Sequence, residues 1–238
     1  MQNKVIVVTG ANGDIGQTVV DALLRQGYEV AACVRCVERS NLKPADSLTL
    51  FSCDFTQQAS VTQCLGAIKK RYKTLFGLVN CVGIAHGASF MMTKPQELAS
   101  VFAINYFAVI GFSQQLVRKM LKQREGVVIN LASTAGILSE QGTLAYGASK
   151  AALIHSSKVM ASELGAFGVR VNAIAPGVVE SSMANEMDQQ SLAALEQRAA
   201  LTSKIYPSEI ADMVVFLLSD SAKNMTGQVL TIDRGISN

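Results

Sequence analysis

The sequence predicts an α/β fold: a doubly wound, seven-stranded parallel sheet in a single domain. Seven short apolar runs, each the length of a buried strand, alternate with longer stretches of helical period. Strands that are apolar along their whole length are buried on both faces, which is typical of parallel sheets covered by helices. The chain has 238 residues, the size of one large α/β domain, and no linker, repeat or low-complexity tract divides it.

The first strand and helix show the pattern on which the other elements are predicted. VIVVT (5–9) is an apolar run that ends at Gly10, and apolar residues then recur at 15, 19, 20, 23 and 24, one stripe of a helix over 15–25. By the same reasoning, further strands are expected at 28–34, 47–53, 75–80, 126–132, 169–175 and 228–232. Further helices are expected at 61–71, 96–122, 146–164 and 208–219.

One connection breaks this alternation. Residues 178–206 contain a stretch rich in Ser, Met, Asn and Gln between a strand and the last helix. Connections of this length are either functional or disordered. We expect this one to be a mobile substrate lid.

Composition and charge exclude several classes of protein. With 49% hydrophobic and 16% charged residues, the chain is globular. The net charge is +3 and no block of Lys and Arg occurs, so nucleic acid is not an expected partner. No apolar run reaches the about 18 residues that span a bilayer. The N-terminal MQNK leads straight into VIVV without a signal-peptide pattern, so we expect a cytoplasmic protein and no membrane association.

Five cysteines lie in the first third of the chain. An odd number without an export signal indicates free thiols. Cys33 and Cys36 have the C-x-x-C spacing of some metal and redox sites, but no second pair occurs and the only histidines are His86 and His155. The pair also follows a strand, whereas a redox pair would open a helix. We interpret these cysteines as small buried or loop residues and expect no metal site.

A glycine-rich turn, TGANGDIG, joins the first strand to the first helix. Gly10, Gly13 and Gly16 stand where a dinucleotide fingerprint would place the pyrophosphate against the amides of the helix N-terminus. Their spacing is three and three, not the two and three of G-x-G-x-x-G, so a plain glycine-rich turn is the alternative. Asp14 puts a carboxylate into this anion site. Asp is a preferred N-cap, so we expect it to cap the helix or face solvent, with pairing to Arg35 as the alternative.

The end of the second strand distinguishes the two nicotinamide dinucleotides. An acidic residue there would bind the ribose 2′-hydroxyl, whereas an Arg accommodates a 2′-phosphate. Val34 stands where the acid is usually expected, and Arg35 follows it. We therefore favour NADP(H). If Arg35 is only a solvated surface charge, NAD(H) stays open.

Tyr146 and Lys150 form the candidate catalytic pair. They stand four apart at the head of a predicted helix, which puts both on one face. A phenol has a pKa near ~10, and a cation alongside would lower it and make Tyr146 an acid–base catalyst. Ser133 follows the fifth strand and can hydrogen-bond a substrate oxygen. Without Ser133, an ordinary exposed Tyr and Lys would explain the pair.

Several motifs in this order are similar to those of short-chain dehydrogenases/reductases. They are TGANGDIG, Asp54, Asn80-Cys81-Val82-Gly83, Asn105, Ser133, Tyr146-x-x-x-Lys150 and Pro176-Gly177. The resemblance covers essentially the whole chain and is nearest to the 3-oxoacyl-(acyl-carrier-protein) reductases. It implies a single NAD(P)-binding Rossmann domain over residues 1–238, a cytoplasmic enzyme, and a homotetramer or homodimer.

The resemblance also implies roles for the matching residues. Tyr146 would be the acid–base catalyst, Lys150 would hold the nicotinamide ribose, Ser133 would polarise the carbonyl, and Asn105 would hold a water that links Lys150 to solvent. The adenine would meet Asp54, the adenosine ribose Asn80, and the nicotinamide amide the 176–179 turn. The implied cofactor-binding residues are Gly10, Asn12, Gly13, Asp14, Ile15, Gly16, Arg35, Asp54, Phe55, Asn80, Cys81, Val82, Gly83, Tyr146, Lys150, Pro176, Gly177, Val179 and Ser181.

Some positions depart from the family pattern. N-N-A-G reads NCVG here, and because Cys81 and Val82 have similar bulk we expect the turn to be preserved. The middle glycine of the dinucleotide fingerprint lies at position 13, whereas the family pattern would place it at position 14. Ser181 replaces a common Thr and should keep a hydroxyl near the carboxamide. The basic residue that often precedes the second glycine in NADP-binding members is absent, so the cofactor preference depends on Arg35.

The substrate is less defined by the sequence. An apolar pocket would be formed by His86, Phe90, Met91, Met92, Leu138, Met183 and Met187, although each Met is equally explained as core filler. Arg198 and Lys204 would attract a phosphopantetheine or CoA carrier. We expect an NADPH-dependent reductase of ketones, including 3-oxoacyl thioesters. The alternatives are an NAD(P)-linked dehydrogenase of a small polar or cyclic alcohol and a non-catalytic NADP-binding sensor.

Overall fold

The computed structural model describes residues 4–186 and 189–237. Seven parallel strands form one sheet in the order β3-β2-β1-β4-β5-β6-β7, which confirms the predicted fold class. The strands are β1 (Val5–Thr9), β2 (Glu29–Val34), β3 (Leu48–Ser52), β4 (Gly77–Asn80), β5 (Gly126–Leu131), β6 (Val169–Pro176) and β7 (Val229–Ile232). Each lies within one or two residues of its predicted range.

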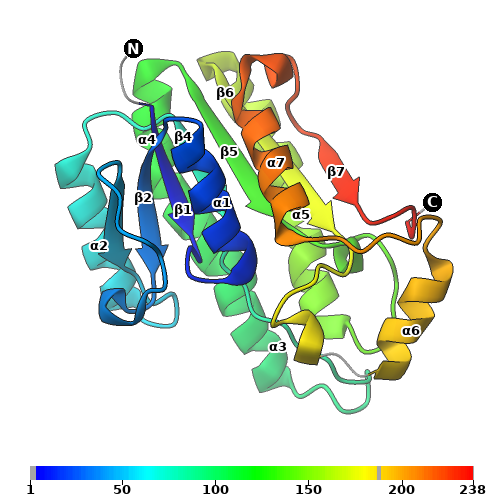
Figure 1. Ribbon diagram of the computed structural model, residues 1–238. Coiled ribbons are helices and arrows are strands. Elements are labelled where there is room, and N and C mark those ends of the chain that lie inside the picture. Colours follow the sequence, from blue (N-terminus) through cyan, green and yellow to red (C-terminus); the bar gives the residue numbers. More distant parts are fainter. Residues whose placement is uncertain (1–3, 187–188, 238) are drawn as a thin grey trace.

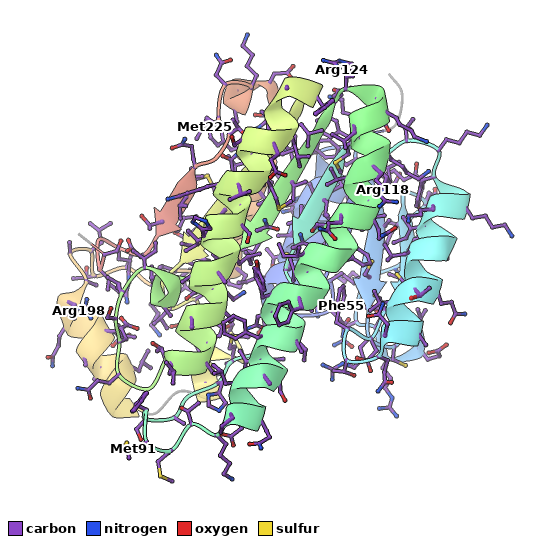
Figure 2. All side chains as sticks on the ribbon, turned by 180° about the vertical axis from the view of Figure 1, so that it is seen from behind. Phe55, Met91, Arg118, Arg124, Arg198 and Met225 are labelled. Carbon is purple, nitrogen blue, oxygen red and sulfur yellow. The ribbon has the colours of Figure 1, made fainter. Side chains whose placement is uncertain are left out.

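Helices cover both faces of the sheet. On one face lie α1 (Asp14–Arg25) and α7 (Pro207–Leu218), seen in front of the strands in Figure 1. On the other face lie α2 (Gln58–Arg71), α4 (Val109–Gln123) and α5 (Leu144–Leu164), which face the viewer in Figure 2. The apolar stripes of α1 and α7 build one core layer with the sheet, and those of α2, α4 and α5 build the other. The observed helices begin one to three residues before their predicted starts, because the first turn of each helix has few apolar residues.

The strand order reverses between β1 and β4, and the turns that follow these two strands meet there. In open α/β sheets this reversal point is where ligands bind. Gly10 has φ +62°, and a Cβ on it would lie 2.7 Å from the amide nitrogen of Val82. Only glycine permits this close approach, so the glycine-rich turn and the 81–83 turn pack directly against each other.

The predicted helix over 96–122 is interrupted. The structure has α3 (Pro95–Phe102), a π-helical stretch η2 (Ala103–Ala108), and then α4. Together they form a helix of 29 residues that could cross a membrane by length and composition alone. Its apolar residues Phe112, Leu116 and Met120 are buried against the sheet, so the core of the domain accounts for them.

The connection between β6 and α7 contains two short helices that the sequence analysis did not predict. They are η5 (Ala184–Glu186) and α6 (Gln189–Arg198). Figure 1 shows α6 and α3 beyond the carboxyl ends of the strands. Val179 pairs with Ile205 in an isolated bridge, which brings the two ends of the connection together.

Candidate functional site

The glycine-rich turn leaves the N-terminus of α1 open. Gly13 is the N-cap residue, and no side chain caps the helix. The first amides of a helix lack intrahelical partners and carry the positive end of its dipole. Asn12 does not use these amides, because its Oδ1 accepts hydrogen bonds from the amide of Asn41 (2.9 Å) and the hydroxyl of Ser40 (3.2 Å). An anion such as a pyrophosphate therefore fits at this helix end.

Asp14 does not cap the helix, so the first of its two expected roles was wrong. Asp14 is the first residue of α1, one position past the cap, and its Oδ2 accepts hydrogen bonds from the amide and the hydroxyl of Ser182, both at 2.7 Å. The side chain is exposed to solvent, which was the second expected role. Its partner in the structure is Ser182 rather than Arg35.

The expected adenosine side of the site follows the ends of β2 and β3. Arg35 is exposed directly after β2, and Val34 beside it is buried. Asp54 accepts hydrogen bonds from the amide (2.9 Å) and hydroxyl (2.8 Å) of Thr56. These bonds hold the pKa of Asp54 below its usual value, and the charge of Arg35 adds to the effect. The ring of Phe55 packs against Phe112 of α4, with centroids 5.3 Å apart, which leaves the backbone of Phe55 for the expected contact with adenine.

The two cysteines of the C-x-x-C pair have different surroundings. Cys33 is buried, with its Sγ 3.8 Å from that of Cys64. Cys36 instead donates to the carboxylate of Glu38 at 3.1 Å in the loop after β2. This supports the interpretation of one buried and one loop residue.

Asn80 acts mainly inside the protein. Its Nδ2 donates to Asn130 Oδ1 (2.8 Å) and Ser113 Oγ (3.0 Å), and the residue is 1% exposed. The side chain therefore ties β4 to β5 and α4, and only its backbone is left for the predicted contact with the adenosine ribose. The NCVG turn keeps its hydrogen bonds to β1, since the amide of Cys81 donates to the carbonyl of Thr9 (3.2 Å). The expectation that this turn is preserved is confirmed.

Lys150 lies at the centre of the catalytic group. It is 4% exposed, and its Nζ donates to the carbonyl of Leu131 at the end of β5 (2.7 Å). Burial lowers the pKa of Lys150 to about 8. The same Nζ lies 5.7 Å from the centroid of the Tyr146 ring.

The pKa of Tyr146 differs from the expectation. A neighbouring cation was expected to lower it, but burial raises the pKa of this phenol, and the hydrogen bond with the Ser133 hydroxyl only opposes the rise. The largest cause is the loss of solvent around the phenol, which disfavours the charged phenolate. Tyr146 is thus held in its protonated form, which is the form that donates a proton.

Ser133 reaches Tyr146 because two segments pack very closely. Ser133 caps the short helix η3 (Thr134–Gly136), and its Oγ accepts a hydrogen bond from the amide of Ala135 (3.2 Å). Gly147, in the first turns of α5, faces this helix, and a Cβ on it would lie 2.5 Å from the carbonyl oxygen of Ala135. The glycine lets α5 approach, and this brings the two hydroxyl groups together.

Asn105 is fully buried in the π-helical stretch η2. Its Oδ1 accepts from the amide of Ile84 (2.8 Å), and its Nδ2 donates to the carbonyl of Ile84 (3.0 Å) and to the hydroxyl of Ser149 (3.1 Å). Ser149 in turn donates to the carbonyl of Tyr146 (2.7 Å). Ser149 was missed by the sequence analysis. Its position directly before Lys150 at the head of the helix was the available signal, but only burial shows that its hydroxyl bonds inward.

The expected nicotinamide side follows β6. The amide of Gly177, after Pro176, donates to the carbonyl of Ile232 (2.9 Å), and Val179 is buried. The Ser181 hydroxyl donates to the carbonyl of Val179 at 3.0 Å. These bonds shape the turn that faces the N-terminus of α1 across the cleft.

The candidate substrate residues form an exposed rim. Phe90, Met91 and Met92 are 75%, 85% and 70% exposed, so the alternative of core filler does not hold for these methionines. Figure 2 shows Met91 at the tip of the molecule. Met183 is 40% exposed, Leu138 is half-buried, and Met187 lies outside the described residues.

The charged candidates near the rim are paired with acidic residues. His86 Nε2 lies 3.6 Å from the carboxylate of Glu97. Arg198 lies 3.5 Å from Glu140, and Lys204 lies 2.9 Å from Glu180. The two cations are thus offset by carboxylates, which weakens the predicted attraction of an anionic carrier.

Comparisons with known proteins agree with this geometry. A family model described as enoyl-(acyl carrier protein) reductase matches residues 10–237. The chain is 30% identical to the 3-oxoacyl-(acyl-carrier-protein) reductase FabG of Thermotoga maritima, over 99% of this chain and 98% of that protein.

Two solved structures from Brucella melitensis superpose closely. One, described as a ribose-5-phosphate isomerase, has a TM-score of 0.91 and 30% identity, over 99% of this chain and 93% of that one. The other, a 3-ketoacyl-(acyl-carrier-protein) reductase complexed with NADH, has a TM-score of 0.91 and 23% identity, over 99% and 98% of the two chains. At that identity, the second likeness shows the fold alone.

Proposed function

Because this chain belongs to the short-chain dehydrogenase/reductase family, we propose that it reduces ketones with NADPH and that its substrates are 3-oxoacyl thioesters. The family places it among the NAD(P)-dependent oxidoreductases that act on CH–OH and C=O groups. The observation that carries the proposal is the meeting of Ser133, Tyr146 and Lys150 at the carboxyl end of β5. The 3-oxoacyl substrate is supported by the name of the Thermotoga relative.

The residues present fit a dinucleotide. The open N-terminus of α1 would hold the pyrophosphate, the 176–181 turn the nicotinamide amide, and Lys150 the nicotinamide ribose. Arg35 is exposed where a 2′-phosphate would lie, and no acidic residue stands at position 34 to prefer a free 2′-hydroxyl. When bound, the nicotinamide supplies the hydride.

The protein's own residues would handle the substrate oxygen. As a carbonyl is reduced, negative charge develops on its oxygen, and the Ser133 hydroxyl would stabilise this charge by a hydrogen bond. Tyr146, held protonated by burial, would give its proton to the same oxygen. The positive charge of Lys150 would stabilise the resulting phenolate. Asn105 and Ser149 would hold the backbone of Ile84 and Tyr146 in place throughout.

A substrate panel tests this function. Loss of NADPH absorbance would be followed with a 3-oxoacyl thioester, a 2-enoyl thioester, a cyclic ketone and ribose 5-phosphate. We expect turnover of the 3-oxoacyl thioester with the highest kcat/KM. Turnover of the enoyl compound alone would overturn the proposed ketone reduction and would show that the protein reduces a C=C bond instead. NADPH binding without turnover of any compound would favour a sensor.

We further propose a cytoplasmic homotetramer or homodimer. Support comes from exposed apolar side chains on the long helices, where Phe107 is 63% and Val159 42% exposed. Light scattering would give the mass of the assembly. A monomer would overturn this part of the proposal without affecting the catalytic one.

The lid over 178–206 also stays a proposal. It is supported by the position of the connection beyond the carboxyl ends of the strands (Figure 1). Hydrogen exchange with and without NADPH and a ketone substrate would test it. We expect slower exchange when both ligands are bound, and unchanged exchange would contradict the lid.

A further inference from the structure

The contact between Asp14 and Ser182 joins two segments that lie 168 residues apart in the sequence. Asp14 belongs to the glycine-rich turn, where the pyrophosphate is proposed to bind, and Ser182 follows the turn proposed for the nicotinamide amide. We infer that Asp14 is a positioning residue, which holds Ser181 and Ser182 against the N-terminus of α1 and so sets the width of the cofactor cleft. The expected effect on cofactor binding rests on the proposed function. The contact between Asp14 and Ser182 does not depend on it.

The geometry of the contact is that of a strong hydrogen-bonded pair. One carboxylate oxygen, Oδ2, takes both an N–H and an O–H donor at 2.7 Å. Hydrogen bonds to an ionised acceptor are shorter and stronger than neutral ones. The carboxylate also lies at the N-terminus of α1, where the helix dipole stabilises a negative charge. A glycine at position 14, the common residue of the family pattern, would offer Ser182 no acceptor.

The contact acts on a limited part of the chain. Residues just before Ser181 are fixed separately, because the amide of Glu180 donates to the carbonyl of Ile205 (2.8 Å) and Lys204 pairs with Glu180 (2.9 Å). The Ser181 hydroxyl, proposed to face the carboxamide, comes directly between this anchored part and the Asp14 contact. Ser181 also keeps its own hydrogen bond to the carbonyl of Val179 (3.0 Å), so losing the Asp14 contact should release Ser182 and loosen its link to Ser181 without unfolding the domain.

An open polar pocket of about 490 Å³ borders the contact and supplies matched controls. Its lining includes Asp14 and Ser182. It also includes Asp21, which lies about two turns further along α1. Asp21 is exposed on the same pocket wall. Because Asp21→Asn removes the same charge from the same region, it isolates the effect of the Asp14 hydrogen bonds from that of charge alone.

The first test uses the protein without cofactor. Hydrogen exchange of the Ser182 amide would be compared in Asp14→Ala, Asp14→Asn, Asp21→Asn and the unchanged chain. Because hydrogen bonds to a charged acceptor are strong but weaker at an exposed site, we expect roughly tenfold faster exchange in Asp14→Ala. The increase should be smaller in Asp14→Asn, which keeps an acceptor oxygen, and absent in Asp21→Asn. Unchanged exchange in Asp14→Ala would overturn the inference.

The second test measures NADPH binding by fluorescence. Ser182→Ala removes one donor and no charge, so we expect the Kd to rise roughly threefold to tenfold with an unchanged melting temperature. Ser182→Thr keeps the hydroxyl and should restore the affinity, and Ser203→Ala, another exposed serine of the same connection, should leave it unchanged. Tighter binding by Ser182→Ala would show that the contact competes with the cofactor and would overturn the positioning role. If the unchanged chain binds no nicotinamide dinucleotide, the proposed function fails and the positioning role fails with it, whereas the exchange measurement still decides whether the contact exists.

Discussion

The candidate catalytic group and the candidate substrate rim lie at the same end of the sheet but are built in opposite ways. Asn105 and Ser149 are fully buried, and Lys150 is nearly so. On the rim, Phe90, Met91 and Met92 are mostly exposed. The first group is polar and each of its side chains is hydrogen-bonded, whereas the second is apolar and faces water. If the proposed function holds, the fold fixes the residues of the chemical step, while substrate choice is left to exposed side chains that can adjust.

Burial explains why the catalytic group is fixed. A buried polar atom without a partner costs about 1–3 kcal/mol, so each side chain is held in the one arrangement that satisfies it. Asn105 uses both ends of its amide, and Lys150 bonds the end of β5. Exposed methionines have no such constraint and can adjust to chains of different shape.

The largest expected effect is on the buried side of this comparison. Tyr146→Phe removes the proton donor and keeps the ring, so kcat/KM for the ketone should fall roughly 10³-fold, in the range of general acid catalysis. NADPH affinity should stay within about twofold, since the ring still fills its place. Steady-state kinetics and NADPH fluorescence measure the two quantities. Tyr206→Phe, at an exposed tyrosine, is the control, and activity retained in Tyr146→Phe would show that another group donates the proton.

The next effect concerns the charge of Lys150. Its pKa is about 8 in the folded protein and 10.5 for an ordinary exposed lysine, as in the unfolded chain, so between these values the unfolded chain binds more protons than the folded one. Burial of the charge therefore costs stability below pH 8, and that cost is relieved as pH rises through 8 towards 10.5. In the unchanged chain, the contribution of Lys150 to the free energy of unfolding should rise by about 3 kcal/mol across this pH range. In Lys150→Met this rise should be absent. Urea unfolding at several pH values measures it, and parallel curves for the two proteins would contradict it.

A smaller effect is expected at an exposed residue that recognises one charge. Arg35→Ser should weaken NADPH binding roughly tenfold, because a hydrogen-bonded charge at an exposed site is partly screened. NADH binding should be unchanged, since it lacks the 2′-phosphate. Arg39→Ser, in the same loop, is the matched control. Equal losses for both dinucleotides would remove Arg35 from the recognition of the 2′-phosphate.

The smallest effect is expected on the rim. Met91→Ser should raise the KM for a long-chain 3-oxoacyl thioester about threefold, as expected for partial loss of apolar contact, and leave kcat unchanged. A short-chain substrate would not reach this residue and should show no change. Comparison of the two chain lengths is the measurement. A fall in kcat for both would mean that the rim is coupled to the catalytic group, contrary to the contrast drawn above.

The sequence predicted the fold correctly, and it also showed which candidate catalytic residues would lie together, because both leave local signals. Buried parallel strands are apolar along their length, and helices carry an apolar stripe, so β1 to β7 and the main helices were found near their true limits. Tyr146, Lys150 and Ser133 stand at the ends of predicted elements, and parallel strands bring such ends to one edge. The sequence by itself thus determined the sheet, the edge at which the site lies, and which residues gather there.

Only the tertiary structure decided which partners these residues take. Asp14 bonds Ser182 instead of capping its own helix, Lys150 bonds the carbonyl of Leu131, and the amide of Asn80 bonds Asn130. The raised pKa of Tyr146 follows from burial, which no spacing in the sequence reveals. The physical reason is the same in each case: a hydrogen bond or a loss of solvent between residues distant in the chain depends on how the layers pack, and local periodicity carries no record of it.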